Sequence, residues 1–290
     1  MATMPIRTGD AAYGWRPDTT TFAPADTVPD ALILQTATVS GEINGDQPSL
    51  HVAYVNDAAA AEYVAEGTEI DDEAPGLDEV LVKTKKISRL VSLSNEQFHQ
   101  DETAAQVATS VARDLVRKAD ASYLGDDGTS GTPTGLLHAA GLIDGDPITD
   151  NLDALVDLLA ELESNRATPS VIVLDPQSWA RIRKLKVGGV NTNESLLGAG
   201  TTDATPMLLS LPVIRSPFIP ANTGLVIDRT AIAAAVGDVK VAQSDHARFH
   251  EDATVLRATW RIGWNLVRPE RVGRFTVAGG DDGGAGEGEG

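Results

Sequence analysis

Ser49-Leu-His-Val-Ala-Tyr-Val55 begins the stretch that decides the fold of this chain. Apolar residues alternate with others from Leu50 to Tyr54, which is the period of a β-strand. A second β-prone run covers residues 79–94, and the segment 57–78 between the two runs is rich in Ala, Gly and acidic residues. The pattern predicts a projecting hairpin. A long charged hairpin is not stable alone in water, so we expect it to lie on another copy of the chain.

A long helix is predicted directly after the hairpin, from about Asn95 to Leu124. Its apolar residues recur at helical spacing: Ala104, Val107, Ala108, Val111, Leu115 and Ala119. Ser94 or Asn95 can cap its start, and Gly125 can end it. The following Gly125-Asp-Asp-Gly128 lacks the spacing and the closing Glu of a calcium loop, which favours a helix stop followed by a turn.

The rest of the chain mixes helices and strands, which predicts an α+β fold. The clearest strand is Thr254 to Leu266, where even positions are mostly apolar and odd positions are mostly polar. Trp260 and Trp264 share the apolar face, so we expect both in the core. Helices are expected at 150–165, 176–186 and, in a run of small residues, 231–236. Further strands are expected at 31–39, 170–174, 208–214, 224–228 and 272–277.

Composition narrows the classes of function. The 290 residues contain no Cys and carry a net charge of −19. Disulfides and thiolate metal sites are therefore excluded, and an acidic chain is repelled by DNA and by anionic membranes. Residues 1–30 lack a secretory signal and no run is long enough to span a membrane. We expect a soluble protein that is made in the cytoplasm.

Charge is divided unevenly along the chain. From Pro17 to Val82 there are 14 Asp or Glu and no Lys or Arg, whereas residues 166–274 contain 14 Lys or Arg. Two such regions can attract each other between copies, although both could also be solvated faces. The acidic contact candidates are Glu62, Glu66, Glu69, Asp71, Asp72 and Glu73. The basic candidates are Arg113, Arg117, Lys118, Arg257 and Arg261.

No motif indicates catalysis, a cofactor or a metal. The chain has no phosphate-binding loop and no Gly-x-Ser-x-Gly elbow. His246 and His250 are four residues apart and could hold a metal on a helix, but the strand that follows favours a turn. The acidic candidates could bind cations weakly, yet a solvated or partner-facing hairpin tip fits them better because little apolar sequence surrounds them.

Six segments, in this order, carry a resemblance to a known family. They are Val64-Ala-Glu-Gly-Thr-Glu-Ile70, Lys85 to Leu93, Leu124-Gly-Asp-Asp-Gly-Thr129, Val171-Ile-Val-Leu-Asp-Pro-Gln-Ser-Trp179, Leu211-Pro-Val-Ile214 and Arg268-Pro269. In this order the chain resembles a tailed-bacteriophage major capsid protein of the Hong Kong 97 type over nearly its whole length.

The resemblance implies a division into capsid domains. Residues 1–48 would be the N-terminal arm and 49–93 the extended loop. Residues 94–129 with 236–266 would form the peripheral domain around the long helix. Residues 130–235 with 267–277 would form the axial domain. The last segment, 278–290, reads from composition as a disordered acidic tail.

The resemblance also implies partners and a location. Copies would form hexamers and pentamers of an icosahedral shell around double-stranded DNA, assembled in the host bacterial cytoplasm and found in the virion. Only about 48 residues precede the loop, which implies a separate scaffolding protein or none; a portal and a decoration protein are further expected partners. Where some members form isopeptide bonds, this chain has Gly67, Asp252 and Thr259, which implies that this chemistry is absent.

Two alternatives stay open at this point. An encapsulin, a shell of the same fold that holds protein cargo, is disfavoured by the long Pro-rich arm. An acidic soluble enzyme is disfavoured by the missing catalytic residues. The contents of purified particles would separate the first alternative from a phage shell.

Overall fold

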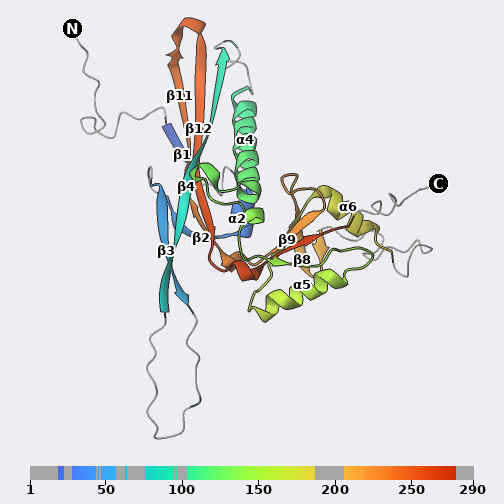
Figure 1. Cartoon of the computed structure of the whole chain (residues 1–290). Coiled ribbons are helices and arrows are strands. Elements are labelled where there is room, and N and C mark those ends of the chain that lie inside the picture. Colours follow the sequence, from blue (N-terminus) through green and yellow to red (C-terminus); the bar gives the residue numbers. More distant parts are fainter. Residues whose placement is uncertain are drawn as a thin grey trace, which may run out of the picture.

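The computed structural model describes residues 19–22, 28–43, 45, 47–56, 63, 76–94, 96, 103–186 and 206–278. These residues form two β-sheets, with a long helix beside the first sheet and two shorter helices on the second (Figure 1). None of the described helices is long and apolar enough to cross a membrane. The fold is therefore a mixed α+β arrangement, as predicted.

The first sheet has seven strands and contains the longest strands of the described chain. A path through it runs β1-β11-β12-β10-β2, while β4 pairs with β12 and β3 pairs with β4. Their bounds are β1 Thr19–Phe22, β2 Thr38–Glu42, β3 Ser49–Asn56, β4 Gly76–Ser94, β10 Ile232–Val236, β11 Val239–Arg248 and β12 Ala253–Leu266.

Strand β12 confirms the alternation read from the sequence. Its even-numbered Trp260 and Trp264 are buried in the same core cluster as Leu115 and Tyr123 of the long helix, α4 (Thr103–Gly125). The Trp264 and Tyr123 rings meet edge to face with centroids 5.3 Å apart, a favoured arrangement for aromatic pairs. Odd-numbered residues of β12 consequently lie on the sheet face opposite α4.

The segment 31–39, expected as one strand, holds a short helix followed by a strand. Helix α2 (Leu32–Thr36) packs on α4, and β2 begins at Thr38. Two buried side chains of α4 hold it: the Asp120 carboxylate accepts the Leu32 amide at 2.8 Å, and Thr36 Oγ1 donates to the Tyr123 hydroxyl at 2.9 Å. These tertiary contacts outweigh the strand preference of the local sequence.

The expected helix at 231–236 is wrong, because residues 232–236 form strand β10. Its three alanines favour a helix in isolation, but β10 pairs with β12 on one side and β2 on the other. All five residues are buried, and their small side chains leave room for the hairpin above them. Pairing on both edges therefore overrides the local helix propensity.

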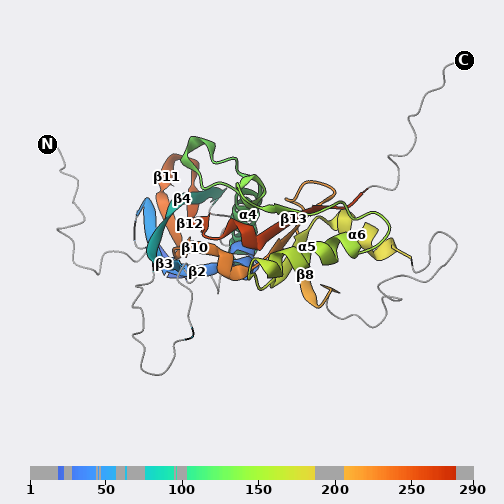
Figure 2. The same ribbon diagram turned by 60° about the horizontal axis from the view of Figure 1, so that its bottom comes forward.

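The second sheet has six strands in the order β5-β13-β9-β6-β8-β7. Their bounds are β5 Ile143–Asp144, β6 Val171–Leu174, β7 Met207–Leu208, β8 Leu211–Arg215, β9 Thr223–Ile227 and β13 Val272–Thr276. The run 208–214, expected as strand, is thus two strands joined by a turn at Leu209 and Ser210, both with positive φ. Figure 2 shows the two sheets on opposite sides of α4.

Helices α5 (Asp153–Ser164) and α6 (Pro176–Lys184) confirm two predicted helices and share a core with the second sheet. The Asp175 carboxylate caps α6 by accepting the amides of Gln177 and Ser178, and Pro176 takes the favoured first helical position. Short 3₁₀ turns connect other elements: η1 Thr129–Gly131, η2 Leu136–His138, η3 Arg229–Ala231, η4 Phe249–Glu251 and η5 Pro269–Arg271.

Candidate assembly surfaces

Strand β4 belongs to two structures at once. Its first part, up to Lys83, pairs antiparallel with β3 from Ser49↔Lys83 to Asn56↔Gly76. Its remaining residues pair with β12 from Thr84↔Gly263 onward. One strand therefore carries the hairpin predicted from the sequence and also fixes that hairpin to the body of the subunit (Figure 1).

A small apolar cluster anchors the base of the hairpin. Val82 is fully buried against Ala233 and Ala235 of β10, with Leu50, Val52 and Val80 packed around them. The strands also approach closely at Gly263, where a Cβ atom would lie 2.3 Å from the Lys83 carbonyl oxygen. Glycine at position 263 is therefore needed for β4 to cross at this distance.

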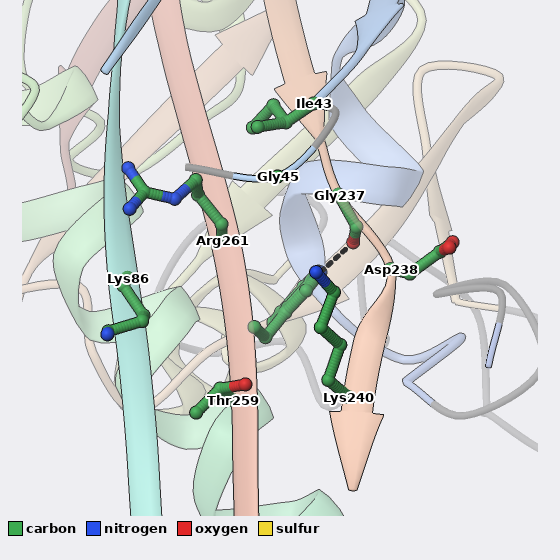
Figure 3. A pocket seen from close by; sticks show the side chains of 9 residues that line it. Ile43, Gly45, Lys86, Gly237, Asp238, Lys240, Thr259 and Arg261 are labelled. Carbon is green, nitrogen blue, oxygen red and sulfur yellow. Dashed lines mark hydrogen bonds between the residues drawn. The ribbon is translucent and has the colours of Figure 1, made fainter. Parts of the chain in front are cut away.

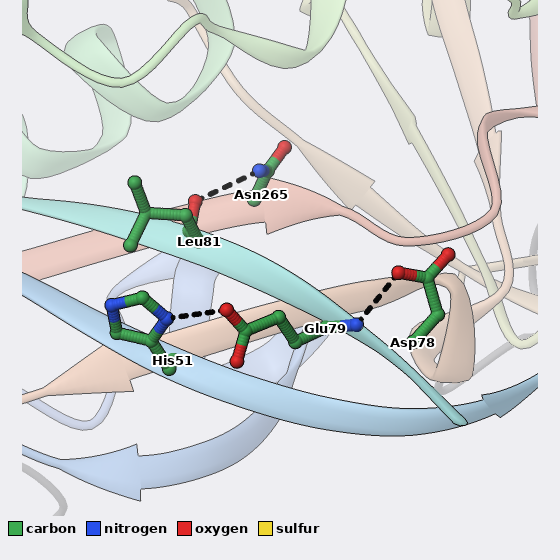
Figure 4. A network of polar contacts seen from close by, with 5 residues as sticks. All are labelled: His51, Asp78, Glu79, Leu81 and Asn265. Carbon is green, nitrogen blue, oxygen red and sulfur yellow. Dashed lines mark hydrogen bonds and ion pairs between the residues drawn. The ribbon is translucent and has the colours of Figure 1, made fainter.

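The opposite face of the hairpin is open to solvent among the described residues. Leu77 and Leu81 are exposed there, and His51 Nδ1 lies 2.9 Å from Glu79 Oε1 between the strands. The Asn265 side-chain amide of β12 donates to the Leu81 carbonyl at 3.0 Å (Figure 4). This face combines apolar and charged groups, as surfaces that bind partners do.

The six acidic candidates, Glu62, Glu66, Glu69, Asp71, Asp72 and Glu73, lie outside the described residues. Within 57–75 only Tyr63 is described, and it is exposed. Their role therefore remains a prediction from the sequence.

The five basic candidates lie on two different faces. Arg113, Arg117 and Lys118 are exposed on α4, where Asp114 already accepts ion pairs from Arg117 at 3.3 Å and Arg89 at 3.2 Å. Arg257 and Arg261 are odd-numbered residues of β12 and lie on the sheet face away from α4. The structure therefore does not bring the five together.

The β12 pair belongs to a larger cluster that the sequence did not reveal. Lys86 of β4 is directly opposite Arg261 in the register, and Lys240 of β11 is opposite Thr259. Together, Lys86, Lys240, Arg257 and Arg261 form what we call the outer-face basic patch. Three of the four line a cavity of about 60 Å³ together with Thr259 and a single acid, Asp238 (Figure 3).

Hydrogen bonds hold residues at the floor of the patch. The Trp260 indole donates to the Gly237 carbonyl at 2.9 Å, and the Arg261 guanidinium donates to Gln47 O at 3.3 Å and Thr84 Oγ1 at 3.2 Å. No ion pair is recorded for Lys86 or Lys240 among the described residues. Excess positive charge held in place by paired strands is suited to an acidic partner.

A second cavity, of about 620 Å³, lies where α4 meets the second sheet and is lined by Leu137, Phe218, Phe275 and others. On its wall Arg274 makes a two-pronged contact with Asp144 at 2.7 and 2.9 Å, and this guanidinium holds the pKa of the Asp144 carboxyl below its usual value. Both side chains are engaged with each other, which indicates a structural role.

The other residues that the sequence singled out lie on several elements. His246 is on β11 and His250 is in η4, and the described residues contain no group of three or more metal-ligating side chains. Thr259 lies within the basic patch, Asp252 is at the exposed β11–β12 turn with φ 46°, and Gly67 lies outside the described residues. Asp127, in the turn after α4, accepts bonds from Thr129 that lower its pKa.

Comparison with known proteins connects this architecture to a family. Residues 25–276 match the phage capsid family, while a search of curated proteins finds no match. The capsid chain of an empty GTA particle superimposes with a TM-score of 0.66 at 18% identity, over 86% of this chain and 90% of that chain. A Mycobacterium phage Bobi chain gives 0.64 at 14% identity, over 93% and 95%. The capsid of Cyanophage P-SCSP1u gives 0.58 at 15%, over 95% and 93%.

At these identities the structural matches establish the fold, and the family match establishes the kind of protein. The mixed α+β fold of the described residues agrees with the resemblance to Hong Kong 97-type capsid proteins. The chain therefore belongs to the phage capsid family and is a Hong Kong 97-type major capsid protein, a structural component of a virion shell and not an enzyme.

Proposed function

We propose that copies of this chain form the hexamers and pentamers of an icosahedral shell that encloses double-stranded phage DNA. The observation that carries the proposal is strand β4, whose first residues form a hairpin with β3 and whose remaining residues join the first sheet. Among the described residues, this hairpin is covered on one face only. A subunit with such an incomplete part is suited to closed assembly with copies of itself.

Electron microscopy of purified particles tests this function. We expect icosahedral shells that contain nuclease-protected double-stranded DNA. Shells of the same fold filled with protein cargo would instead indicate a cellular compartment of the encapsulin type, and a chain that stays monomeric at high concentration would contradict both.

Within the subunit we propose the division implied by the resemblance: arm 1–48, extended loop 49–93, peripheral domain 94–129 with 236–266, axial domain 130–235 with 267–277, and tail 278–290. Its support is the second core cluster, which the second sheet forms with α5 and α6 wholly within the proposed axial domain. The first cluster joins α4 and the first sheet to the other face of the second sheet. Because β4 continues through the loop boundary, the loop and the peripheral domain should unfold together.

We also propose that the acidic segment Glu62–Glu73 of one subunit docks on the outer-face basic patch of its neighbour. Each exposed ion pair contributes only about 0–1 kcal/mol, but repetition around a shell multiplies the effect. The basic candidates on α4 are less suited to bind the acidic segment because Arg117 already shares Asp114 with Arg89.

Additional proposed partners are a separate scaffolding protein, a portal and a decoration protein. Expression of this chain alone tests whether a scaffold is required for closed shells.

We further propose that the shell is held without covalent bonds between subunits. Cys is absent, so disulfides cannot form. In the positions that the resemblance assigns to an isopeptide bond, Gly67 offers no amine, Asp252 offers no amide and Thr259 offers no carboxylate. Particles boiled in detergent should therefore give one band near 30.4 kDa on a denaturing gel. A ladder of ring-sized species would contradict this and direct attention to Lys83, Lys85 and Lys86.

A further inference from the structure

The C-terminal half of helix α6 carries a concentration of positive charge. Four of the six residues in 181–186 are Lys or Arg, and no Asp or Glu occurs between Asp175 and Glu194. Lys184 is exposed, and no ion pair is recorded for it among the described residues. The helix dipole favours cations near a C-terminus. We call the four cations together the α6 basic surface: Arg181, Arg183, Lys184 and Lys186.

Hydrogen bonds place the residue after β13 beside this surface. The Val277 amide donates to the Asn222 carbonyl at 2.8 Å, and the Arg181 guanidinium donates to the side-chain oxygen of the same Asn222. The Asn222 amide donates in turn to Asp175, the cap of α6, at 3.2 Å. Val277 is buried and Ala278 is exposed. The chain therefore leaves the core with a single residue, Asn222, between it and Arg181.

The residues that follow carry the opposite charge. Segment 279–290 consists of seven Gly, four acidic residues and one Ala. It has no large apolar side chain to bury, so charge is the main interaction that it can contribute. Its four negative charges equal in number the four positive charges of the α6 basic surface. Twelve extended residues can span up to about 40 Å, whereas the nine residues of α6 are about 14 Å long.

We propose that residues 281–289 lie on the α6 basic surface of their own subunit and hinder the binding of other polyanions there. A single exposed ion pair contributes little, but the anchored Val277 makes the contact intramolecular and so raises the effective concentration of the acidic residues at α6. The acidic hairpin segment 57–79 is less suited to this surface, because it is joined to the first sheet, on the other side of α4. Clustered Lys and Arg otherwise attract the phosphates of nucleic acids. The tail therefore lowers the affinity of the subunit for DNA.

Cross-linking tests the contact in unassembled subunits, so the result does not depend on shell formation. A carbodiimide joins a Lys amine directly to a carboxylate. At low salt the expected product links Lys184 or Lys186 to Asp281 or Asp282, identified by mass spectrometry of tryptic peptides. Lys240, an exposed residue of β11 in the first sheet, is the matched control and should not link to the tail. In a mixture of isotope-labelled and unlabelled subunits, each linked pair should carry one label only.

Binding of a short DNA duplex measures the effect of the tail. Replacing the four tail acids by amides should raise the affinity of unassembled subunits at low salt about threefold or more, because the α6 cations become available to phosphates. The changes are Asp281→Asn, Asp282→Asn, Glu287→Gln and Glu289→Gln. A control with the same change in net charge on α5 should raise the affinity by less than half as much: Asp153→Asn, Asp157→Asn, Glu161→Gln and Glu163→Gln.

A combined variant assigns the effect to α6. When Arg183→Gln, Lys184→Gln and Lys186→Gln are already present, neutralising the tail should no longer raise the affinity for DNA. An equal rise with and without these three cations overturns the proposal, since the tail then acts only through net charge. Absence of cross-links at Lys184 and Lys186, or cross-links found only between labelled and unlabelled chains, also overturns it. Circular dichroism establishes that each variant is folded.

Discussion

The second sheet and the projecting hairpin differ in how one subunit covers their apolar residues. All four residues of β6 are buried, between α5 and α6 on one side and the main core on the other. In the hairpin, Val82 is fully buried while Leu77 remains 79% exposed. Strand β6 is therefore covered within one subunit, whereas the described residues leave one face of the hairpin exposed and pair β3 with β4 alone.

The largest predicted effect on the free energy of unfolding is in the second sheet, because its core is buried within one subunit. Phe275 of β13 is buried with its ring over Gly224, where a Cβ would lie 2.3 Å from Cζ. Phe275→Ala should lower the free energy of unfolding by about 3–5 kcal/mol, a large share of the roughly 5–15 kcal/mol typical of a domain. Denaturant unfolding of unassembled subunits measures this.

The neighbouring exposed residue provides the control for that variant. Thr276→Ala should change the free energy of unfolding by less than about 0.5 kcal/mol. If Phe275→Ala changed the free energy of unfolding equally little, the second sheet would not be stabilised by its own buried core.

A smaller effect is expected where α2 is held against α4. Burial raises the pKa of Asp120 from 3.8 to about 6, although the Leu32 amide lowers it in part and Asp30 adds repulsion. The folded state then binds the proton more tightly than the unfolded state, so stability falls as pH rises from about 4 to about 6. Asp120→Asn should raise the free energy of unfolding at pH 8 by up to about 3 kcal/mol.

The amide that this substitution introduces still offers an oxygen acceptor to the Leu32 N–H. The gain should therefore disappear below about pH 4, where the carboxyl of Asp120 is protonated and neutral as well. Urea titrations at pH 4 and pH 8 provide this comparison. An Asp120→Asn variant that is less stable at pH 8 would show that the charge itself holds α2.

A substitution at Gly263 should affect assembly more than it affects the stability of the subunit. Gly263→Ala places a Cβ 2.3 Å from the Lys83 carbonyl, which should force β4 away from β12 and lower stability by about 1–3 kcal/mol. Because the hairpin projects from this crossing, shell yield should fall far more than subunit stability. Gly125→Ala is the control, since no atom lies within 4 Å of its Cβ position; equal loss of shells in both variants would contradict this role for Gly263.

Much of this architecture could be predicted because the relevant patterns are local. The alternation in β12, the apolar spacings of α4 and α5, and Pro176 at the start of α6 each depend on a single segment. The strand β10 could not be predicted, because its alanines are buried by pairing with β12 and β2, which lie far away in sequence. Helix α2 was missed for a similar reason, since Asp120 and Tyr123 hold it from α4.

Only part of the outer-face basic patch could be predicted, because its residues come together through contacts between strands that are distant in sequence. Arg257 and Arg261 were identified from the sequence, but Lys86 and Lys240 join them only through the register of three strands. Cross-strand neighbours depend on that register, which a single sequence does not supply. The grouping of Arg113, Arg117 and Lys118 with these residues relied on charge alone, and α4 lies on the other face of the sheet.

Charge reversal with rescue tests the central claim, that the hairpin of one subunit is completed by the basic patch of another. Changing Glu69, Asp71, Asp72 and Glu73 to Lys should prevent shells while leaving folded subunits, and so should Lys86→Glu with Lys240→Glu and Arg257→Glu. A chain that carries both sets of changes restores opposite charges between the hairpin and the three changed residues of the patch, and electron microscopy should show shells again. Normal shells from either single set, or no recovery in a folded chain that carries both, would contradict the account.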